Sequence, residues 1–102
     1  MRIVYITTRN SGEAKKIASH LLKKRLIACA NIFPIESMYW FEGEIEENIE
    51  FVLLGKTTDS NFNKIEKEVS SMHSYEIPAI YSWKVDKVSK DYDDWIKKEV
   101  KR

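Results

Sequence analysis

The chain has 102 residues, of which 43% are hydrophobic and 32% are charged, and its formal net charge at pH 7 is +1. This length and composition predict one globular domain over residues 1–102 and exclude a disordered chain. Seventeen basic residues balanced by sixteen acidic ones argue against nucleic acid or an anionic membrane surface as a partner. There is one cysteine, no signal-peptide pattern, and no apolar run of about eighteen residues, so we expect a cytoplasmic protein.

The first part of the chain predicts a strand, a helix and one arm of a hairpin. Ile3–Thr8 is rich in β-formers, and Asn10 followed by Glu13 is typical of a capped helix N-terminus. The helix is expected to turn an apolar stripe toward the core: Ala14, Ile17, Ala18, Leu21 and Leu22. A strand is expected from about Leu26 to Phe41, with Pro34 marking a bend, a bulge or an edge position, because proline cannot donate to a ladder.

The second part predicts the other arm, a helix, a strand and a last helix. After a turn at Glu42-Gly43-Glu44, a strand is expected from about Ile45 to Thr57. Asp59 or Ser60 is expected to cap a helix with a core stripe of Phe62, Ile65, Val69 and Met72. Ala79–Val85 predicts a fourth strand. A helix from about Ser89 places Tyr92, Trp95, Ile96 and Val100 on one side, and residues 98–102 are expected to be exposed and dispensable.

The element order βαββαβ plus a terminal helix predicts an α+β, ferredoxin-like fold. Two helices would cover one face of an antiparallel sheet, and the second and third strands would form a long hairpin. Phe51–Leu54 is a continuous apolar run, so both faces of the third strand are expected to be dry. A small sheet with two dry faces suggests that another chain covers one of them.

Several short motifs, in this order and spacing, resemble the CutA family of divalent-cation-tolerance proteins. They are Arg25-Leu-Ile-Ala-Cys-Ala-Asn31, Tyr39-Trp40, Glu42-Gly43-x-Ile45, Glu50, Lys56-Thr57 and His73-Ser-Tyr75-x-x-Pro78. The chain departs from the family at Ser74, where proline is common, and at Phe41, where a second tryptophan is common. The resemblance implies a non-enzymatic homotrimer that is linked to divalent metal tolerance and copper binding and requires no cofactor.

The resemblance also implies where a ligand would bind. Five residues match positions that line an inter-subunit cleft in the family: Tyr39, Trp40, Glu50, Lys56 and Tyr75. Glu50 interrupts an apolar stretch, and it is expected to pair with Lys56 or with a neighbouring subunit. Packing between subunits is the other explanation for the aromatic residues.

His73 matches the histidine of the family motif and is the candidate metal ligand, for Cu²⁺ or another divalent cation. Candidate partners are Met72, Cys29 and His20, none of which has the spacing of a known metal motif. The alternative for His73 is a helix-end histidine that interacts with free carbonyls. The alternative for Cys29 is a small buried hydrophobe, and the glutamates at the hairpin turn are expected to be solvated.

The sequence supports three other classes of function less well than a CutA-like protein. A PII-like trimeric sensor with a small ligand at its subunit clefts has the same fold, but the chain lacks a phosphate-binding loop. RNA binding is disfavoured because the third strand is acidic where an RNA-recognition strand is basic. No hydrolase motif or nucleophile elbow is present, which favours a protein that is not an enzyme.

Overall fold

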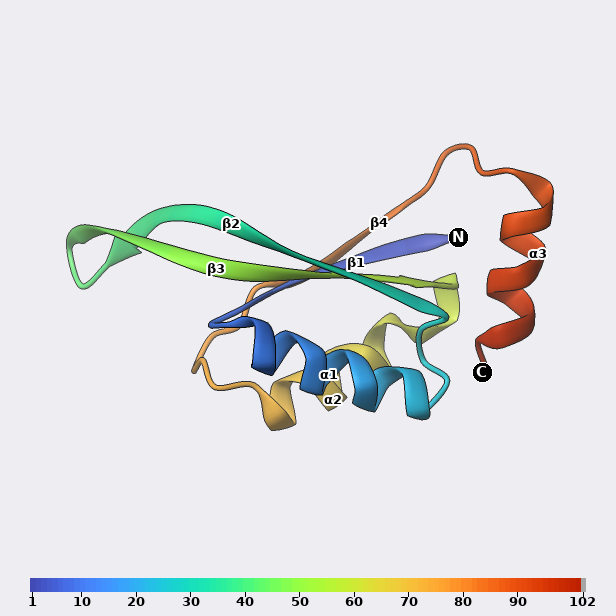
Figure 1. Ribbon diagram of the computed structural model, residues 1–102, viewed down its shortest axis with the longest axis horizontal. Helices are drawn as coiled ribbons and strands as arrows, with labels where there is room; N and C mark the ends of the chain where they lie inside the picture. Colours follow the sequence, from blue (N-terminus) through green and yellow to red (C-terminus); the bar gives the residue numbers. More distant parts are fainter. Residues whose placement is uncertain (102) are drawn as a thin grey trace.

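The computed structural model describes residues 1–101, which form a four-stranded antiparallel sheet and three α-helices. The elements are β1 (Arg2–Thr8), α1 (Ser11–Lys23), β2 (Cys29–Phe41), β3 (Glu44–Thr57), α2 (Phe62–Met72), β4 (Ile80–Lys84) and α3 (Lys90–Glu99). The strand order is β2-β3-β1-β4, which is the ferredoxin-like order expected from the sequence. Figure 1 shows α1 and α2 below this sheet and α3 beyond one end of it.

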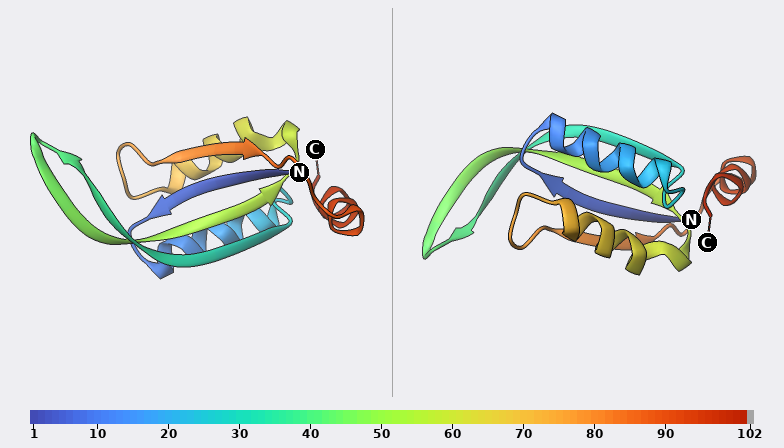
Figure 2. Two further views of the ribbon diagram at one scale, coloured as in Figure 1. Left: turned by 90° about the horizontal axis from the view of Figure 1, so that it is seen from above. Right: turned by 90° about the horizontal axis from the view of Figure 1, so that it is seen from below.

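The two faces of the sheet have different surroundings. Seen from below, α1 and α2 cover one face; seen from above, they leave the other uncovered (Figure 2). Because strand side chains alternate, the register places Val4 and Ile6 toward the helices, where both are fully buried. We call the other side the open face. It carries Ile3, Tyr5, Thr7, Cys29, Asn31, Phe33, Val52, Leu54, Lys56, Tyr81 and Trp83.

The core lies between the sheet and its two covering helices. It contains Val4, Ile6, Ile17, Ala18, Leu21, Leu26, Ile27, Leu53, Ile65 and Val69. Leu53 pairs with Ile6 and is 0% exposed, and its neighbour Val52, on the open face, is also 0% exposed. The run Phe51–Leu54 is therefore buried at its two central residues within one chain, whereas Phe51 and Leu54 are half-buried.

The distal hairpin, residues 35–50, extends beyond the rest of the sheet (Figure 1). β1 pairs with β3 only from Phe51 to Thr57, so the distal hairpin is a two-stranded ribbon. Its turn has positive φ at Glu42 (51°) and Gly43 (81°), the pattern of a two-residue type I′ turn, which glycine favours. Its exposed apolar side chains are Met38, Tyr39, Trp40, Phe41, Ile45 and Ile49.

The structure confirms some local expectations and corrects others. Asn10 caps α1 by accepting a hydrogen bond from the Glu13 amide (2.8 Å), and Pro34 lies on an edge strand. Leu22 was assigned to the core stripe, which is wrong: it is 39% exposed. The cap predicted at Asp59 or Ser60 is also wrong. Instead, a 3-10 turn over Asp59–Asn61 leads into α2 without a side-chain capping bond.

The end of the chain is held in place rather than dispensable. Val100 is 6% exposed, the Lys101 amide donates to the Arg25 carbonyl (2.9 Å), and the buried Asn61 amide group donates to the Lys101 carbonyl (3.1 Å). The expectation that residues 98–102 do little is therefore wrong for Val100 and Lys101, whereas Lys98 is exposed as expected and Arg102 lies outside the described residues. Sequence periodicity does not reveal these contacts, because two of them are hydrogen bonds made by the backbone of Lys101.

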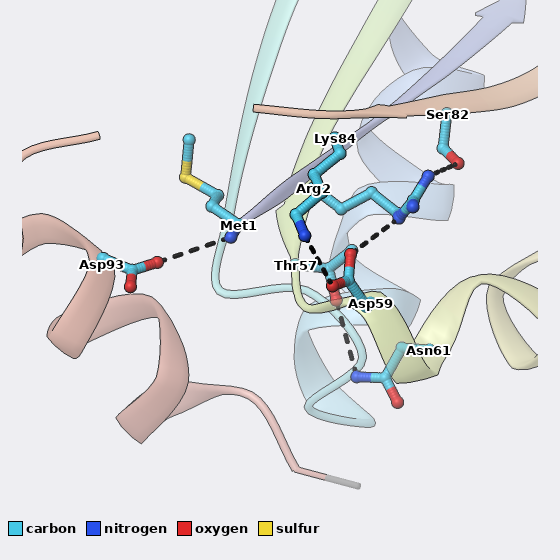
Figure 3. A network of polar contacts seen from close by, with 8 residues as sticks. All are labelled: Met1, Arg2, Thr57, Asp59, Asn61, Ser82, Lys84 and Asp93. Atoms are coloured by element: carbon cyan, nitrogen blue, oxygen red, sulfur yellow. Dashed lines mark hydrogen bonds and ion pairs between the residues drawn. The ribbon is translucent and has the colours of Figure 1, made fainter. Parts of the chain in front are cut away.

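Polar contacts join α3 and the loop after β3 to the adjacent end of the sheet (Figure 3). The ammonium group of Met1 lies 3.5 Å from Asp93. The Arg2 guanidinium donates to Asp59 (3.1 Å) and to Ser82 (3.0 Å). These contacts lie at the start of β1. Thr7 and Thr8 lie at the other end of β1, next to the candidate site described below.

Candidate functional site

A groove of about 880 Å³ lies between the distal hairpin and the loop that precedes β4. Its lining comprises Thr7, Glu36, Ser37, Met38, Tyr39, Trp40, Phe41, Glu50, Tyr75, Glu76, Ile77 and Ala79. The hairpin supplies aromatic side chains and methionine. The loop supplies Tyr75 and Ile77, and Ile77 is 88% exposed. We call this the hairpin groove.

His73 fixes the loop that forms one wall of the groove. Its Nε2 lies 2.7 Å from the Thr7 carbonyl oxygen, and its Nδ1 lies 3.0 Å from the Tyr75 amide nitrogen. The carbonyl can only accept and the amide can only donate, so Nε2 carries the proton and Nδ1 is the acceptor. The His73 and Tyr75 rings are also in contact, with centroids 4.8 Å apart. His73 thus ties the loop to β1 and orients Tyr75.

Glu13 supports the same loop from the start of α1. One carboxylate oxygen accepts from the Arg9 amide (3.0 Å) and the other from the Ser74 amide (2.9 Å). Burial of Glu13 raises its pKa, but these hydrogen bonds outweigh burial, and the net pKa lies below its ordinary value. The sequence suggested Glu13 only as a partner for the helix cap. Its bond to Ser74 was missed because 61 residues separate the two.

Replacing Glu13 by glutamine is expected to lower the free energy of unfolding at pH 7 by about 1–3 kcal/mol, because one charge-assisted backbone bond is lost. A carboxyl group whose pKa is lowered by folding stabilises the protein at pH values above its pKa in the unfolded chain, about 4.3. This stabilisation is lost as the pH falls through the pKa of the folded state. The difference between the proteins should therefore vanish on acidification. Urea titrations from pH 7 to pH 3 measure it. A difference independent of pH would contradict the role assigned to the carboxylate.

Glu50 is the buried charged residue among those that line the groove. It is 8% exposed, and its Oε2 accepts a hydrogen bond from the Tyr75 hydroxyl at 2.7 Å. Burial and the adjacent Glu50 raise the pKa of Tyr75 well above its usual range, so the phenol stays neutral and donates. Glu50 Oε1 has no hydrogen bond or ion pair with the described residues.

The structure brings four of the five predicted cleft residues together, namely Tyr39, Trp40, Glu50 and Tyr75. Lys56 is not among them. It lies six residues beyond Glu50 on β3, roughly 20 Å away at strand spacing, so the expected pair between the two does not form within one chain. Lys56 Nζ instead donates to Asn31, lies 3.8 Å from the Cys29 sulfur, and stands 5.8 Å from the centre of the Tyr92 ring.

The candidate metal ligands do not converge within residues 1–101. Both ring nitrogens of His73 are hydrogen-bonded to the chain itself. His20 lies on α1 and contacts Glu68 at 2.7 Å, while Cys29 lies at the far end of the sheet beside Lys56. The described residues contain no group of three or more His, Cys, Asp or Glu side chains arranged to hold a metal ion. A metal site at His73 remains a prediction, and the described His, Cys, Asp and Glu side chains do not complete it.

The open face carries an aromatic cluster that sequence analysis did not single out. The rings of Tyr5 and Tyr81 stack at 4.9 Å, and Trp83 lies 6.4 Å from each of them. Tyr81 is 51% exposed and Trp83 is 44% exposed. The alternation Tyr81-Ser-Trp83 in β4 was the available signal, since it places both rings on one face.

Comparison with known proteins gives consistent results across the chain. Residues 2–99 match the family model described as CutA1 divalent ion tolerance protein. The divalent-cation tolerance protein CutA of Archaeoglobus fulgidus is 43% identical over 97 residues, which cover 95% of each chain. Its counterpart in Thermotoga maritima is 41% identical and covers 98% of this chain and 99% of its own.

Solved structures agree with the sequence matches. A crystal structure of CutA1 from Pyrococcus horikoshii with one substitution superposes with a TM-score of 0.97 at 39% identity, with full coverage of both chains. The A. fulgidus structure, described as a periplasmic divalent cation tolerance protein, superposes with a TM-score of 0.96 at 42% identity and covers 99% of this chain and all of its own. The fold, the motifs and these matches together show that the chain belongs to the CutA1 divalent ion tolerance family.

Proposed function

We propose that this chain is a non-enzymatic divalent-cation tolerance protein that works in the cytoplasm as a homotrimer. Family membership and the names of the relatives support the link to divalent cations. The observation that carries the assembly is the open face, on which Tyr81, Trp83 and Phe33 are 51%, 44% and 37% exposed. Exposed aromatic side chains on a sheet face that no helix covers support an interface there.

The distal hairpin supports self-association in a second way. An isolated two-stranded ribbon is marginally stable in water, yet this one exposes Trp40 (74%), Ile49 (61%) and Ile45 (58%). Contact with other copies would bury these side chains and supply the surface that the ribbon lacks. Three copies are the number implied by the resemblance described above.

The assembly is tested by the mass in solution. Light scattering after size exclusion is expected to give about 36 kDa, three times the 12.0 kDa chain, because a closed symmetric ring buries every copy of the interface. The measurement should be made from micromolar to sub-micromolar concentration, to show whether dilution releases single chains. A mass of one chain at micromolar concentration would remove the homotrimer from the proposal.

Copper binding at His73 is a further part of the proposal, and the geometry predicts that it is weak. A metal could reach Nδ1 only by displacing the Tyr75 amide, or Nε2 only by displacing the Thr7 carbonyl. Titration calorimetry with Cu²⁺ is expected to show binding above that of other first-row divalent ions, and weaker at acid pH, because a protonated imidazole cannot ligate. His73→Ala should lower the affinity. Equal affinity in both proteins would exclude His73 as the ligand.

The cytoplasmic location remains an expectation. Within the described residues, no helix is long and apolar enough to cross a membrane. The lone cysteine, Cys29, is unpaired in the described chain and fits a reducing compartment. The A. fulgidus relative, however, is described as periplasmic. Fractionation of source cells followed by immunoblotting would decide between the two compartments.

The second candidate function, a trimeric sensor of a small ligand, is favoured by one observation. The hairpin groove is large enough for a small molecule, and its walls are aromatic. Its charged lining residues are carboxylates, namely Glu36, Glu50 and Glu76, so it does not suit nucleotides or other phosphates. The negative charge of these residues therefore limits the kinds of ligand that such a sensor would bind.

A further inference from the structure

Arg25, which follows the end of α1, has a backbone conformation that usually requires glycine. Its φ is 59°, and the hydrogen bonds of a Schellman motif surround it. The Arg25 amide donates to the Leu22 carbonyl (3.0 Å), and the Leu26 amide donates to the Leu21 carbonyl (3.0 Å). A residue with a Cβ atom is strained in this left-handed region, so other contacts must hold it there. We call residues 25–28 the corner.

The last described residues, 99–101, supply those contacts, and we call them the C-terminal strap. The Lys101 amide donates to the Arg25 carbonyl (2.9 Å), and the Arg25 guanidinium lies 2.6 Å from a carboxylate oxygen of Glu99. Val100, between them, is 6% exposed. The strap therefore contacts the strained residue at both its backbone and its side chain.

The buried side chain of Asn61 joins the strap to the corner. Its amide nitrogen lies within hydrogen-bond distance of the Lys101 carbonyl (3.1 Å) and the Leu26 carbonyl (3.5 Å). The Leu26 carbonyl also accepts from the hydroxyl of Thr57 (2.6 Å), which is itself fully buried. Strap, corner and the end of β3 thus share one set of polar contacts, whose partners would lose their hydrogen bonds together.

The corner also fixes the backbone of β3 at Lys56. The Ala28 amide donates to the Lys56 carbonyl at 2.8 Å. A Cβ atom added to Gly55 would lie 3.1 Å from Cγ2 of Ile27, so the corner packs directly against the strand. Lys56 is the predicted cleft residue that lies apart from the hairpin groove, and its backbone position depends on the corner.

We propose that the C-terminal strap and the corner form one conformational device. The strap keeps Arg25 in its left-handed conformation, and release of the strap opens the corner and loosens the end of β3 at Lys56. The device uses contacts that are formed within one chain, at the opposite end of the molecule from the distal hairpin (Figure 1). None of them requires a surface that is free of other copies, so the inference is independent of the proposed function.

Hydrogen exchange of the protein as purified, followed by NMR, tests whether strap and corner open together. The amides of Lys101 and Leu26 are expected to have protection factors within about threefold of each other, and at least about tenfold below that of Leu53 in the core. A Lys101 amide that exchanges as if unprotected, beside a Leu26 amide protected as strongly as Leu53, would overturn the proposal.

A proline at position 101 removes the amide that joins the strap to the corner. Val100 is extended (φ −89°, ψ 131°), as a residue before proline prefers, so Lys101→Pro suits the backbone. It is expected to speed exchange at Leu26 about tenfold, by loss of one hydrogen bond, and to change exchange at Leu53 less than about twofold.

The matched control is Lys101→Ala, which keeps the amide and should leave exchange at Leu26 unchanged. The mass in solution is measured for each variant, so that dissociation is not mistaken for opening of the corner. Unchanged exchange at Leu26 in Lys101→Pro, or equal acceleration at Leu53, would overturn the proposal. If Lys101→Pro does not fold, the comparison of amides in the wild type decides.

Two substitutions at Arg25 test the strain. Arg25→Gly and Arg25→Ala both remove the guanidinium, but only glycine adopts the left-handed conformation without strain. Combined with Lys101→Pro, Arg25→Gly is expected to slow exchange at Leu26 about fivefold relative to Arg25→Ala, because the corner then needs less support from the strap. Equal exchange in the two double variants would show that no strain is held at Arg25, and the proposal would be wrong.

Discussion

Replacing Leu53 by aspartate is expected to cost more than about 5 kcal/mol of folding free energy, enough to unfold a typical domain of this size. Leu53 is 0% exposed and packs in the core on the helix side of β3, opposite Ile6. The substitution removes a buried leucine, leaves a cavity and buries an unpaired charge. Far-UV circular dichroism and thermal unfolding measure the loss directly.

The same strand provides the control. Ile49 lies four residues earlier on β3, on the same side of the strand by alternation, but it is 61% exposed in the distal hairpin. Ile49→Asp is expected to leave secondary structure intact and to affect only association. If Leu53→Asp were folded but monomeric, Leu53 would be an interface residue, as the sequence alone suggested, and the burial described here would be wrong.

Replacing Trp83 by glutamate is expected to reduce the mass in solution from three chains to one at micromolar concentration without unfolding the chain. Trp83 is 44% exposed on the open face and does not belong to the core between the sheet and its helices, so the substitution leaves that core unchanged. In the proposed assembly it would remove a buried aromatic anchor, typically worth about 2 kcal/mol or more, and place a charge in an apolar contact. Light scattering gives the mass and circular dichroism the fold.

A matched change on the opposite side of the molecule completes this test. Ser19 is exposed on α1, within the helical layer, and Ser19→Glu introduces the same charge there. It is expected to leave the mass unchanged. If Trp83→Glu kept the mass of three chains, the open face would not be the interface. If Ser19→Glu dissociated the protein, the helical layer would be an interface as well.

The fold was predictable because its signals are local. Helical spacing gave α1 and α2, the turn at Glu42-Gly43 gave the hairpin, and their order gave the ferredoxin-like topology. Boundaries and individual positions were less predictable. Leu22 satisfies the helical spacing but lies at the edge of the core stripe, where tertiary packing rather than periodicity decides exposure.

The site was predictable only in part. The family resemblance indicated Tyr39, Trp40, Glu50 and Tyr75, and the structure places all four around one groove. The resemblance did not indicate that Glu13 supports the loop before β4, because the hydrogen bond from the Ser74 amide depends on the path of the backbone. It also grouped Lys56 with Glu50, since a list of cleft residues does not say whether one chain supplies them all. Spacing along β3 separates the two.

The two-stranded character of the distal hairpin has a consequence for the order in which the molecule forms. Backbone amides of β3 from Phe51 onward are bonded within a four-stranded sheet, whereas those nearer the turn depend on one neighbouring strand. In a single chain, amide protons near Gly43 should exchange with solvent through local opening, and those near Leu53 only through global unfolding. Assembly would slow exchange at the turn. The hairpin, although paired within one chain, would then reach its full protection only in the assembly, so that the stability of its distal part would depend on protein concentration.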